Sequence, residues 1–386
     1  MGEWKNVRVG ELGKIITGKT PKTSISDNYG GRIPFLTPSD NMSVKYVGKT
    51  SKTLTEKGLL EVKNAILPEN SVCVSCIGSD LGKAVITTCP TVTNQQINSI
   101  IVDEKSFDVS FVYYAMQILG KKMNFISKTS TAVPIVNKSS FSSYEIKCPP
   151  REDQKRIAAV LSALDSKIEC NKKINDNLEQ QAAALFSSLY NRSNTEVRYT
   201  DLIQILGGGT PKTGETAYWN GNIAFFTPKD VGTPYTFITE KTITEEGLSH
   251  CNSRLYPVNT VFVTARGTVG KVGLSGVPMA MNQSCYALVG KETHQLLVYF
   301  YTLKAVDRLK HKASGAVFDA ITTRDFDSEQ IMKLSDDDAK AFLCVAEPMF
   351  QEILNNSIEN LRLSTLRDFL LPKLMSGEID VSSVQL

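Results

Sequence analysis

The second half of this chain repeats the first. The sequence TPKT occurs at Thr20–Thr23 and again at Thr210–Thr213, and FLTPSD at Phe35–Asp40 is matched by FFTPKD at Phe225–Asp230, in both cases about 190 residues later. The offset shortens slightly toward the end of each copy, as expected when surface loops gain or lose single residues. A chain of 386 residues built in this way predicts two copies of one domain, each with its own core.

Each copy has the same internal order, a mixed segment of about 145 residues and then one long helix. Ser71–Ile77 and Thr260–Thr264 are β-branched runs bounded by turn residues and predict strands. Aromatic and leucine clusters at 111–119 and 296–309 predict one packed helix per copy, so we expect an α/β or α+β fold. The predicted segments are a first domain (1–150), a first spacer helix (151–192), a second domain (193–334), a second spacer helix (335–378) and a C-terminal tail (379–386).

The segments that follow the two domains carry matching heptad patterns. From Arg151 to Tyr190 there is no Gly or Pro, and apolar residues follow alternating steps of four and three. The two positions of this pattern that lack an apolar residue, 171 and 175, are both asparagine. The second helix repeats the pattern, asparagines included, about 185 residues later. The predicted pairing positions are Leu164, Ile168, Asn171, Asn175 and Leu178 in the first helix and Met349, Ile353, Asn356, Asn360 and Leu363 in the second.

Two helices of equal length with polar residues near their midpoints are suited to pair as an antiparallel coiled coil with pseudo-twofold symmetry. The asparagines would then meet and fix the register. In the alternative, each helix packs on its own domain or the asparagines face solvent. Pro348 and Pro372 interrupt the second pattern and predict a kink or break near the ends of that helix.

Composition excludes several classes of protein. The chain is 41% hydrophobic and 22% charged, and its apolar runs are short, which predicts a soluble, cytoplasmic protein without a membrane span. Eight cysteines are too few and too irregularly spaced for a disulfide framework, so we expect free thiols. Cys73 and Cys76 form a Cys-x-x-Cys, but the second pair that a zinc site needs is missing, which argues against a metal or redox role. The net charge of +3 is small, and the excess of Lys and Arg lies within the two predicted domains.

This organisation suits a protein that contacts two separate sites on DNA. A helix of about 40 residues is about 60 Å long, and at about 3.4 Å per base pair this length spans between one and two turns of a duplex. Two similar domains held apart by such a spacer could each contact one half of a split target.

The order of motifs resembles that of the specificity subunit of type I restriction-modification systems over nearly the whole chain. The segments that carry the resemblance are 17–21 with 33–40, 208–211 with 223–230, ARGTVGK (265–271), the helix opening PPREDQKRI (149–157) and LRDFLLPKLMSGEI (366–379). The resemblance implies a non-catalytic chain with two target recognition domains, one for each half of a split double-stranded DNA target. It also implies docking of two methyltransferase subunits and, through the complex, of restriction subunits, with S-adenosylmethionine, ATP and Mg²⁺ bound by those partners and none by this chain.

The second helix departs from the family pattern at its start. Asp336–Ala339 lacks the Pro-Pro pair that opens the first helix, and Ala339 stands where the counterpart of Gln154 is expected. If the helix openings help to dock the methyltransferase, the two docking sites are therefore unequal.

Residues of an active site are hard to find in this sequence. His250, His294 and His311 have no counterparts in the other copy, so a histidine nucleophile or general base has little support. Gly78–Lys83 resembles a phosphate-binding loop, but it is one residue short and is followed by Ala84 instead of Ser or Thr. The sequence therefore favours a binding protein over an enzyme.

DNA contact is the more plausible use of the polar loops, because phosphates attract Lys and Arg, and base edges attract Arg, Lys, Asn and Gln. The repeat-linked candidates for DNA binding are Lys19, Lys22, Arg32 and Lys83 in the first domain and Lys212, Lys229, Arg266 and Lys271 in the second. Two further candidates, Lys128 and Lys312, lie in segments 128–131 and 310–314, which differ between the copies. In the alternative, these charges are solvated groups around structural turns. The residues that either read bases or tie down a turn are Asn94, Gln95, Asn282 and Gln283.

The sequence thus predicts a DNA-specificity subunit. One alternative is a coiled-coil adaptor without sequence-specific DNA binding, and another is a methyltransferase or nuclease that acts alone. The exposed helix surface leaves self-association of the isolated chain open.

Overall fold

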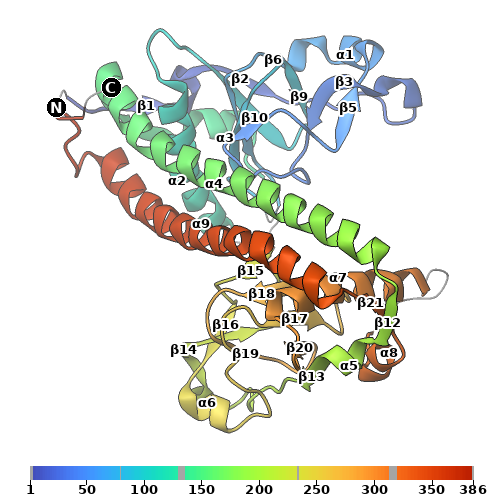
Figure 1. The fold of residues 1–386 in the computed structure, drawn as a ribbon. Coiled ribbons are helices and arrows are strands. Elements are labelled where there is room, and N and C mark those ends of the chain that lie inside the picture. Colours follow the sequence, from blue (N-terminus) through green and yellow to red (C-terminus); the bar gives the residue numbers. More distant parts are fainter. Residues whose placement is uncertain (1–2, 79, 129–134, 233, 313–319, 385–386) are drawn as a thin grey trace. The chain divides into compact units, whose positions relative to one another are not determined.

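The computed structural model describes residues 3–78, 80–128, 135–232, 234–312 and 320–384. The chain divides into two compact units, unit 1 formed by Met1–Glu169 with Leu361–Leu386, and unit 2 formed by Cys170–Asn360. Each unit contains one globular domain and part of both long helices, α4 (Arg151–Arg192) and α9 (Asp336–Ser376) (Figure 1).

The first domain, in unit 1, is a mixed α/β domain with three sheets. Its elements are β1 (Lys5–Arg8), η1 (Val9–Glu11), β2 (Gly13–Thr17), η2 (Ser26–Asn28), β3 (Tyr29–Leu36), β4 (Tyr46–Val47), β5 (Lys52–Leu54), α1 (Glu56–Glu61), η3 (Lys63–Ala65), β6 (Ile66–Leu67), β7 (Ser71–Ser75), β8 (Ala84–Thr87), β9 (Thr91–Thr93), β10 (Ile97–Val102), α2 (Val109–Lys128), α3 (Lys138–Ser143) and β11 (Glu145–Cys148). The strand orders are β2-β10-β7-β8-β4, β5-β3-β9-β6 and β1-β11. Most neighbours are antiparallel, but β3 pairs with β9, and β4 with β8, in parallel.

The second domain, in unit 2, follows the same order. Its elements are β12 (Thr195–Arg198), α5 (Tyr199–Leu202), β13 (Ile203–Gly207), η4 (Thr216–Tyr218), β14 (Trp219–Phe226), β15 (Tyr235–Thr236), β16 (Lys241–Ile243), α6 (Glu245–Ser249), β17 (Val261–Thr264), β18 (Val272–Ser275), β19 (Met279–Met281), β20 (Cys285–Gly290), α7 (Gln295–Lys312), α8 (Thr323–Asp327) and β21 (Gln330–Lys333). The sheets β13-β20-β17-β18-β15 and β12-β21 match those of the first domain, as do the parallel pairs β14 with β19 and β15 with β18. The remaining sheet, β16-β14-β19, has three strands where the first domain has four, and an isolated bridge between Tyr256 and Met279 takes the place of β6. The predicted duplication and the α/β fold are confirmed.

The central sheet of the first domain is buried on both faces. Because side chains alternate along a strand, Val72 and Val74 of β7 pack in the same core as Phe111 of α2, whereas Cys73 packs with Val85 in a core on the other face. The sheet therefore lies between helix α2 and the second sheet, which explains why all five residues of β7 are buried.

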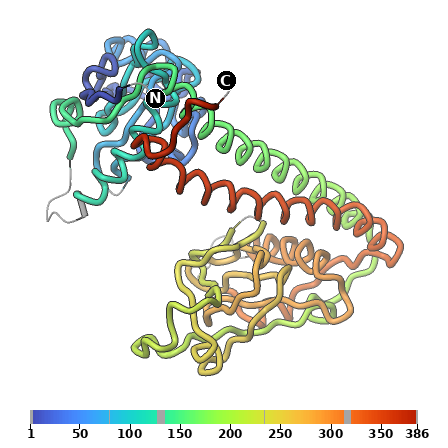
Figure 2. The backbone as a smooth tube through the Cα atoms, turned by 90° about the vertical axis from the view of Figure 1, so that its left-hand side faces the viewer, coloured from blue at the N-terminus to red at the C-terminus, as the bar shows by residue number. Residues whose placement is uncertain are grey.

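Helices α4 and α9 pair in antiparallel fashion within each unit and run side by side in both views (Figures 1 and 2). In unit 1, Asp165 of α4 forms an ion pair with Arg367 of α9, and in unit 2, Arg192 near the end of α4 forms one with Asp338 near the start of α9. The predicted antiparallel helix pair is confirmed. Both helices also contribute to the domain cores, so pairing and packing on the domains occur together.

Asparagines from the two helices meet within unit 2. Asn171 Nδ2 donates hydrogen bonds to Asn360 Oδ1 (3.0 Å) and to Glu359 Oε2 (2.7 Å), and Asn356 Nδ2 donates to Asn175 Oδ1 (3.0 Å). Asn171, Asn175 and Asn356 are buried. The alternative in which the asparagines face solvent is therefore excluded.

Two prolines and a glycine have different effects on α9. Pro348 and Pro372 lie inside a helix that runs without interruption from Asp336 to Ser376, so of the predicted kink or break the break is wrong and the kink stays a prediction. Tertiary packing of buried neighbours outweighs the hydrogen bond that each proline removes. Gly377, with a φ of +80°, ends the helix in the left-handed conformation. The tail beyond it returns to the first domain, where Val381 is buried in the core.

Candidate nucleic-acid interface

Parallel strands bring two polar loops together in each domain. Since β3 and β9 run in the same direction, the chain leaves both at one edge of the sheet, and Asn94 N donates to Leu36 O across that edge (3.1 Å). In the second domain β14 and β19 do the same, with Asn282 N donating to Phe226 O (3.0 Å). The loops that follow are therefore neighbours in both copies.

The repeated Thr-Pro-x-Asp motif is a turn held by its own aspartate. Asp40 Oδ2 accepts hydrogen bonds from Thr37 N (2.8 Å) and Thr37 Oγ1 (2.9 Å), and its Oδ1 accepts one from Ser51 N (2.7 Å). Partial burial acts to raise the pKa of Asp40, but these hydrogen bonds hold it below its usual value. Asp230 accepts the same set from Thr227 and Glu240. The shared residues of this motif are structural, and the third residue of the motif lies exposed at the tip of the turn.

The glycine-rich segments after β7 and β17 are also turns. Ser75 Oγ accepts from Lys83 N, and Thr264 Oγ1 accepts from Lys271 N, both at 3.0 Å. The segment 78–83 is followed by strand β8 and not by the helix that a phosphate-binding loop requires. Its resemblance to a nucleotide site is therefore explained by turn formation.

A cavity of about 450 Å³ lies where three of these loops meet in the second domain. Lys229 at the tip of the Thr-Pro-Lys-Asp turn, Lys241, Thr268 and Asn282 line it. Thr268 Oγ1 donates to Pro228 O (3.1 Å), which holds the loop after β17 against that turn. The surface so formed offers cations, a hydroxyl and an amide, the groups that contact phosphates and base edges, together with the carboxylate of Glu240, which pairs with Lys229.

Within the described part of the chain, the candidate cations divide into two groups. The residues that make no hydrogen bond or ion pair through their exposed side chains are Lys19, Lys22, Lys212, Arg266 and Lys271. The others are paired with acidic groups, Arg32 with Glu56 (3.2 Å), Lys83 with Asp80 (2.6 Å), Lys229 with Glu240 (3.6 Å) and Lys312 with Glu329. The first group is the more available for DNA phosphates, and the DNA contacts stay predictions.

Lys312 has a structural contact that sequence reasoning did not foresee. Glu329 is fully buried and forms ion pairs with Lys312 and with Arg308 Nε (2.7 Å). A buried carboxylate needs such partners, so Lys312 stabilises the domain itself. The side chain of Lys128 and the residues 129–131 and 313–314 lie outside the described residues.

The amide side chains mainly support turns. Asn94 Oδ1 accepts from Gln96 N (3.1 Å) and Asn282 Oδ1 from Ser284 N (3.0 Å). Gln95 Oε1 accepts from Thr20 Oγ1 (2.6 Å), and Gln283 makes the matching contact with Thr210. Of the two predicted uses, the structure supports tying down the loops.

Sequence reasoning missed Lys241, which lines the cavity and lies over the ring of Trp219, 5.4 Å from its centroid. A signal was present, because KTI at Lys241–Ile243 repeats KTL at Lys52–Leu54.

The start of α4 and the two cysteines serve the interior. Gln154 is buried, its Oε1 accepting from Asp108 N (2.9 Å) and its Nε2 donating to Pro149 O (3.0 Å), so it ties α4 to the first domain and is not itself exposed to a partner. Cys73 and Cys76 pack on opposite faces of the sheet, and burial raises the pKa of Cys73 to about 12. Among the described residues no cluster of three or more His, Cys, Asp or Glu side chains could hold a metal ion.

Helices long and apolar enough to cross a membrane are absent from the described ranges.

Comparison with known proteins gives consistent results. The family model of the type I restriction modification DNA specificity domain matches residues 1–180 and 191–333. The chain is 25% identical to the type I restriction enzyme MjaIX specificity subunit of Methanocaldococcus jannaschii, over 99% of this chain and 95% of that protein. It is 32% identical to the HindI specificity subunit of Haemophilus influenzae, over 45% of this chain and 39% of that protein. The S subunit of a type I restriction-modification system from M. genitalium has the same fold, with a TM-score of 0.61 at 15% identity, over 97% of this chain and 96% of that one.

Proposed function

This chain belongs to the type I restriction-modification DNA specificity family, and on that premise we propose that each of its two target recognition domains binds one half of a split DNA sequence. The observation that carries the proposal is the duplicated loop cluster. In both domains the loops that follow a parallel strand pair meet at one edge of the sheet and are held by the same hydrogen bonds. An exposed lysine lies at this edge in each copy: Lys229 in the turn of the second domain, and Lys19, whose backbone N donates to Thr93 O, in the first.

The two copies share the scaffold of these loops but differ at exposed positions. Ser39 in the first domain corresponds to Lys229 in the second, and Ile77 corresponds to Arg266. Exposed lysines such as Lys22 suit phosphate contacts, which orient a protein on DNA without reading sequence. We expect the differing positions to read the two half-sites, because Arg and Lys can distinguish base edges in the major groove.

The helix pair sets the distance between the half-sites in this proposal. Helix α4 contains 42 residues and is therefore about 63 Å long. A change in helix length by whole turns should change the gap in the DNA target and leave both half-sites unchanged.

The chemistry of the complex belongs to partner chains in this proposal. We expect two methyltransferase subunits to bind S-adenosylmethionine and dock on the helices, and restriction subunits to bring ATP- and Mg²⁺-dependent cleavage. The cytoplasm, where such partners would meet the chromosome, is the expected location.

Co-expression of this chain with the methyltransferase subunit encoded beside it, followed by single-molecule sequencing of the methylated DNA, tests the proposal. A split motif with methylated bases in both halves is the expected result. A stable complex that methylates only continuous motifs would refute the two-domain mode of recognition. Absence of a complex, together with absence of salt-dependent DNA binding, would favour a coiled-coil adaptor, and methylation by the chain alone would favour an enzyme.

A further inference from the structure

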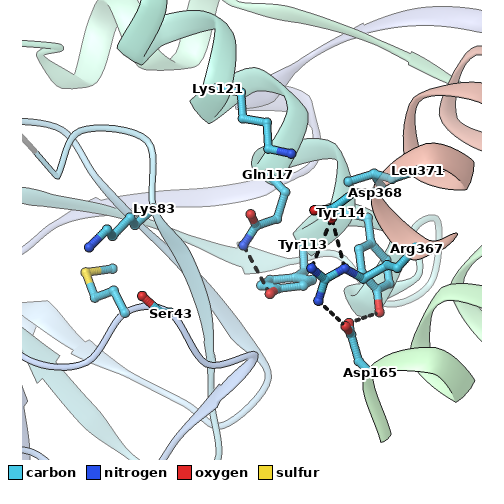
Figure 3. A pocket seen from close by; sticks show the side chains of 11 residues that line it. Ser43, Lys83, Tyr113, Tyr114, Gln117, Lys121, Asp165, Arg367, Asp368 and Leu371 are labelled. Carbon is cyan, nitrogen blue, oxygen red and sulfur yellow. Dashed lines mark hydrogen bonds and ion pairs between the residues drawn. The ribbon is translucent and has the colours of Figure 1, made fainter. Parts of the chain in front are cut away.

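A polar network joins the first domain to both long helices inside unit 1 (Figure 3). Asp165 of α4 accepts a hydrogen bond from Tyr114 OH of α2 (2.5 Å) and forms an ion pair with Arg367 of α9 (2.9 Å). Lys45, just before β4, donates to Ser162 Oγ of α4 (2.6 Å) and to Tyr114 OH (3.2 Å). We call Lys45, Tyr114, Ser162, Asp165 and Arg367 the polar junction.

The polar junction is partly shielded from solvent, and Tyr114, Asp165 and Arg367 line a cavity of about 280 Å³ (Figure 3). The side chain of Asp165 is 15% exposed and that of Arg367 is 29% exposed, and Lys45 lies over the ring of Tyr114, 4.7 Å from its centroid. Burial lowers the pKa of Lys45 to about 8, against the opposing effect of the nearby Asp165 carboxylate. Charge-assisted hydrogen bonds in such an environment are strong and directional.

The corresponding place in unit 2 is built differently. By the repeat, Asp165 corresponds to Phe350 and Arg367 to Ala182, both buried, and Tyr114 corresponds to Phe300. Phe300 packs against Phe350 with ring centroids 5.6 Å apart and stacks on Phe186 at 5.0 Å. The second copy therefore holds the same helices with an aromatic cluster and one hydrogen bond, from Tyr299 OH of α7 to Glu179 Oε1 of α4 (3.1 Å), so the fold of the domain does not require the polar junction.

The two kinds of contact constrain a domain differently. Apolar side chains can repack with small shifts at low cost, whereas hydrogen bonds weaken steeply when the angle at the hydrogen departs from linearity. The polar junction joins four segments: the chain before β4, α2, α4 and α9. It therefore fixes the angle at which the first domain is held on the helices of its own unit.

We propose that the polar junction is a positioning element that selects the gap between the two half-sites, in addition to helix length. The inference rests on the proposed function. A first domain held at one angle presents its loops in one orientation. When the gap is one base pair longer or shorter, the half-site is displaced along the axis of the DNA duplex and rotated about it, so it fits these loops less well.

The test uses the complex with the methyltransferase subunit and duplexes that carry both half-sites at the native gap, or at a gap one base pair longer or shorter. Asp165→Asn keeps the shape and removes the charge, and Tyr114→Phe removes one hydroxyl. We expect both variants to lose about tenfold in the ratio of methylation rates between the native and the shifted gaps, with the half-site sequences unchanged, because one charge-assisted hydrogen bond is worth about that factor. Arg367→Lys, which keeps a cation beside Asp165, should lose less.

Tyr113→Phe is the matched control. Tyr113 lies beside Tyr114 on α2, and its hydroxyl accepts a hydrogen bond only from Gln117 (3.0 Å) among the described contacts (Figure 3). This variant should keep the native gap ratio. Tyr114→Phe keeps the test decisive if Asp165→Asn does not fold, since it is nearly isosteric.

The outcomes separate the inference from the proposed function. A wild-type complex that methylates no split motif would refute both. A wild-type split motif with an unchanged gap ratio in folded Tyr114→Phe protein would refute the inference alone, as would an equal loss in Tyr113→Phe or a change in the half-sites instead of the gap.

Discussion

The hydrogen bond between Asn175 and Asn356 should behave as a coupled pair. Asn356 Nδ2 donates to Asn175 Oδ1 (3.0 Å), and both side chains are more than nine-tenths buried. Replacing one asparagine by leucine leaves the other amide buried without this partner, which costs about 1–3 kcal/mol. Replacing both removes the two polar groups together, so the double variant should lie within about 1 kcal/mol of the wild type. Asn175 Nδ2 also donates to Ser357 Oγ (3.2 Å), and when Asn175 is replaced Ser357 keeps its own hydrogen bond to Ile353 O (2.6 Å).

Urea unfolding followed by far-ultraviolet circular dichroism measures these differences, with the free energy of unfolding taken from the transition that responds to Asn175→Leu. The coupling between the two substitutions should be about 2 kcal/mol or more. Asn177→Leu makes the same change on an exposed position of α4 and should shift stability by less than about 0.5 kcal/mol. Additive losses in the double variant would refute the reasoning, because they would show that neither asparagine depends on the other.

Three further predictions follow from charged residues. The pKa of Lys45 is lowered from 10.5 to about 8 in the folded chain, so the charge on this group costs about 3 kcal/mol of folding free energy below pH 8, and the cost disappears as the pH rises to 10.5. The free energy of unfolding, measured with urea at each pH, should therefore rise less between pH 8 and 10 for Lys45→Met than for the wild type. Lys22→Ala and Lys212→Ala should each weaken binding to all DNA sequences alike and reduce the salt dependence by about one phosphate contact, measured by fluorescence anisotropy titrations. Lys312→Ala should lower the free energy of unfolding by about 1 kcal/mol, because it removes one of the ion pairs of Glu329. The DNA affinity of the folded variant, measured as a control, should equal that of the wild type.

Much of the fold was accessible from the sequence because it is duplicated. A motif such as FLTPSD gains meaning when FFTPKD recurs in the same order, and the structure shows one turn in both places. The heptad pattern likewise predicted the helix pair, since its period and its asparagines recur together. Of the kink or break predicted at Pro348, the break was wrong because packing of the surrounding side chains, which no local pattern reports, holds the helix.

The parallel strand pairs and the polar junction could not be predicted. Strands β9 and β19 contain only three residues each, too few for a periodic signal. The polar junction joins Lys45, Tyr114, Asp165 and Arg367, which are far apart in the chain and have no polar counterparts in the second copy. Contacts of that kind depend on the packing of finished elements, and a search for repeated motifs passes over them.

The duplication also separates scaffold from function within one molecule. Asp40 and Asp230 are identical and make the same hydrogen bonds, so they serve what the two domains have in common. A residue that reads one half-site must instead be exposed and differ between copies, as Arg266 does. Asp165 differs from its counterpart Phe350 as well, but Phe350 is buried and the side chain of Asp165 is only 15% exposed. We propose that such a difference between two domains of the same fold acts on how each domain is held, and that it contributes to the selection of the gap between the half-sites.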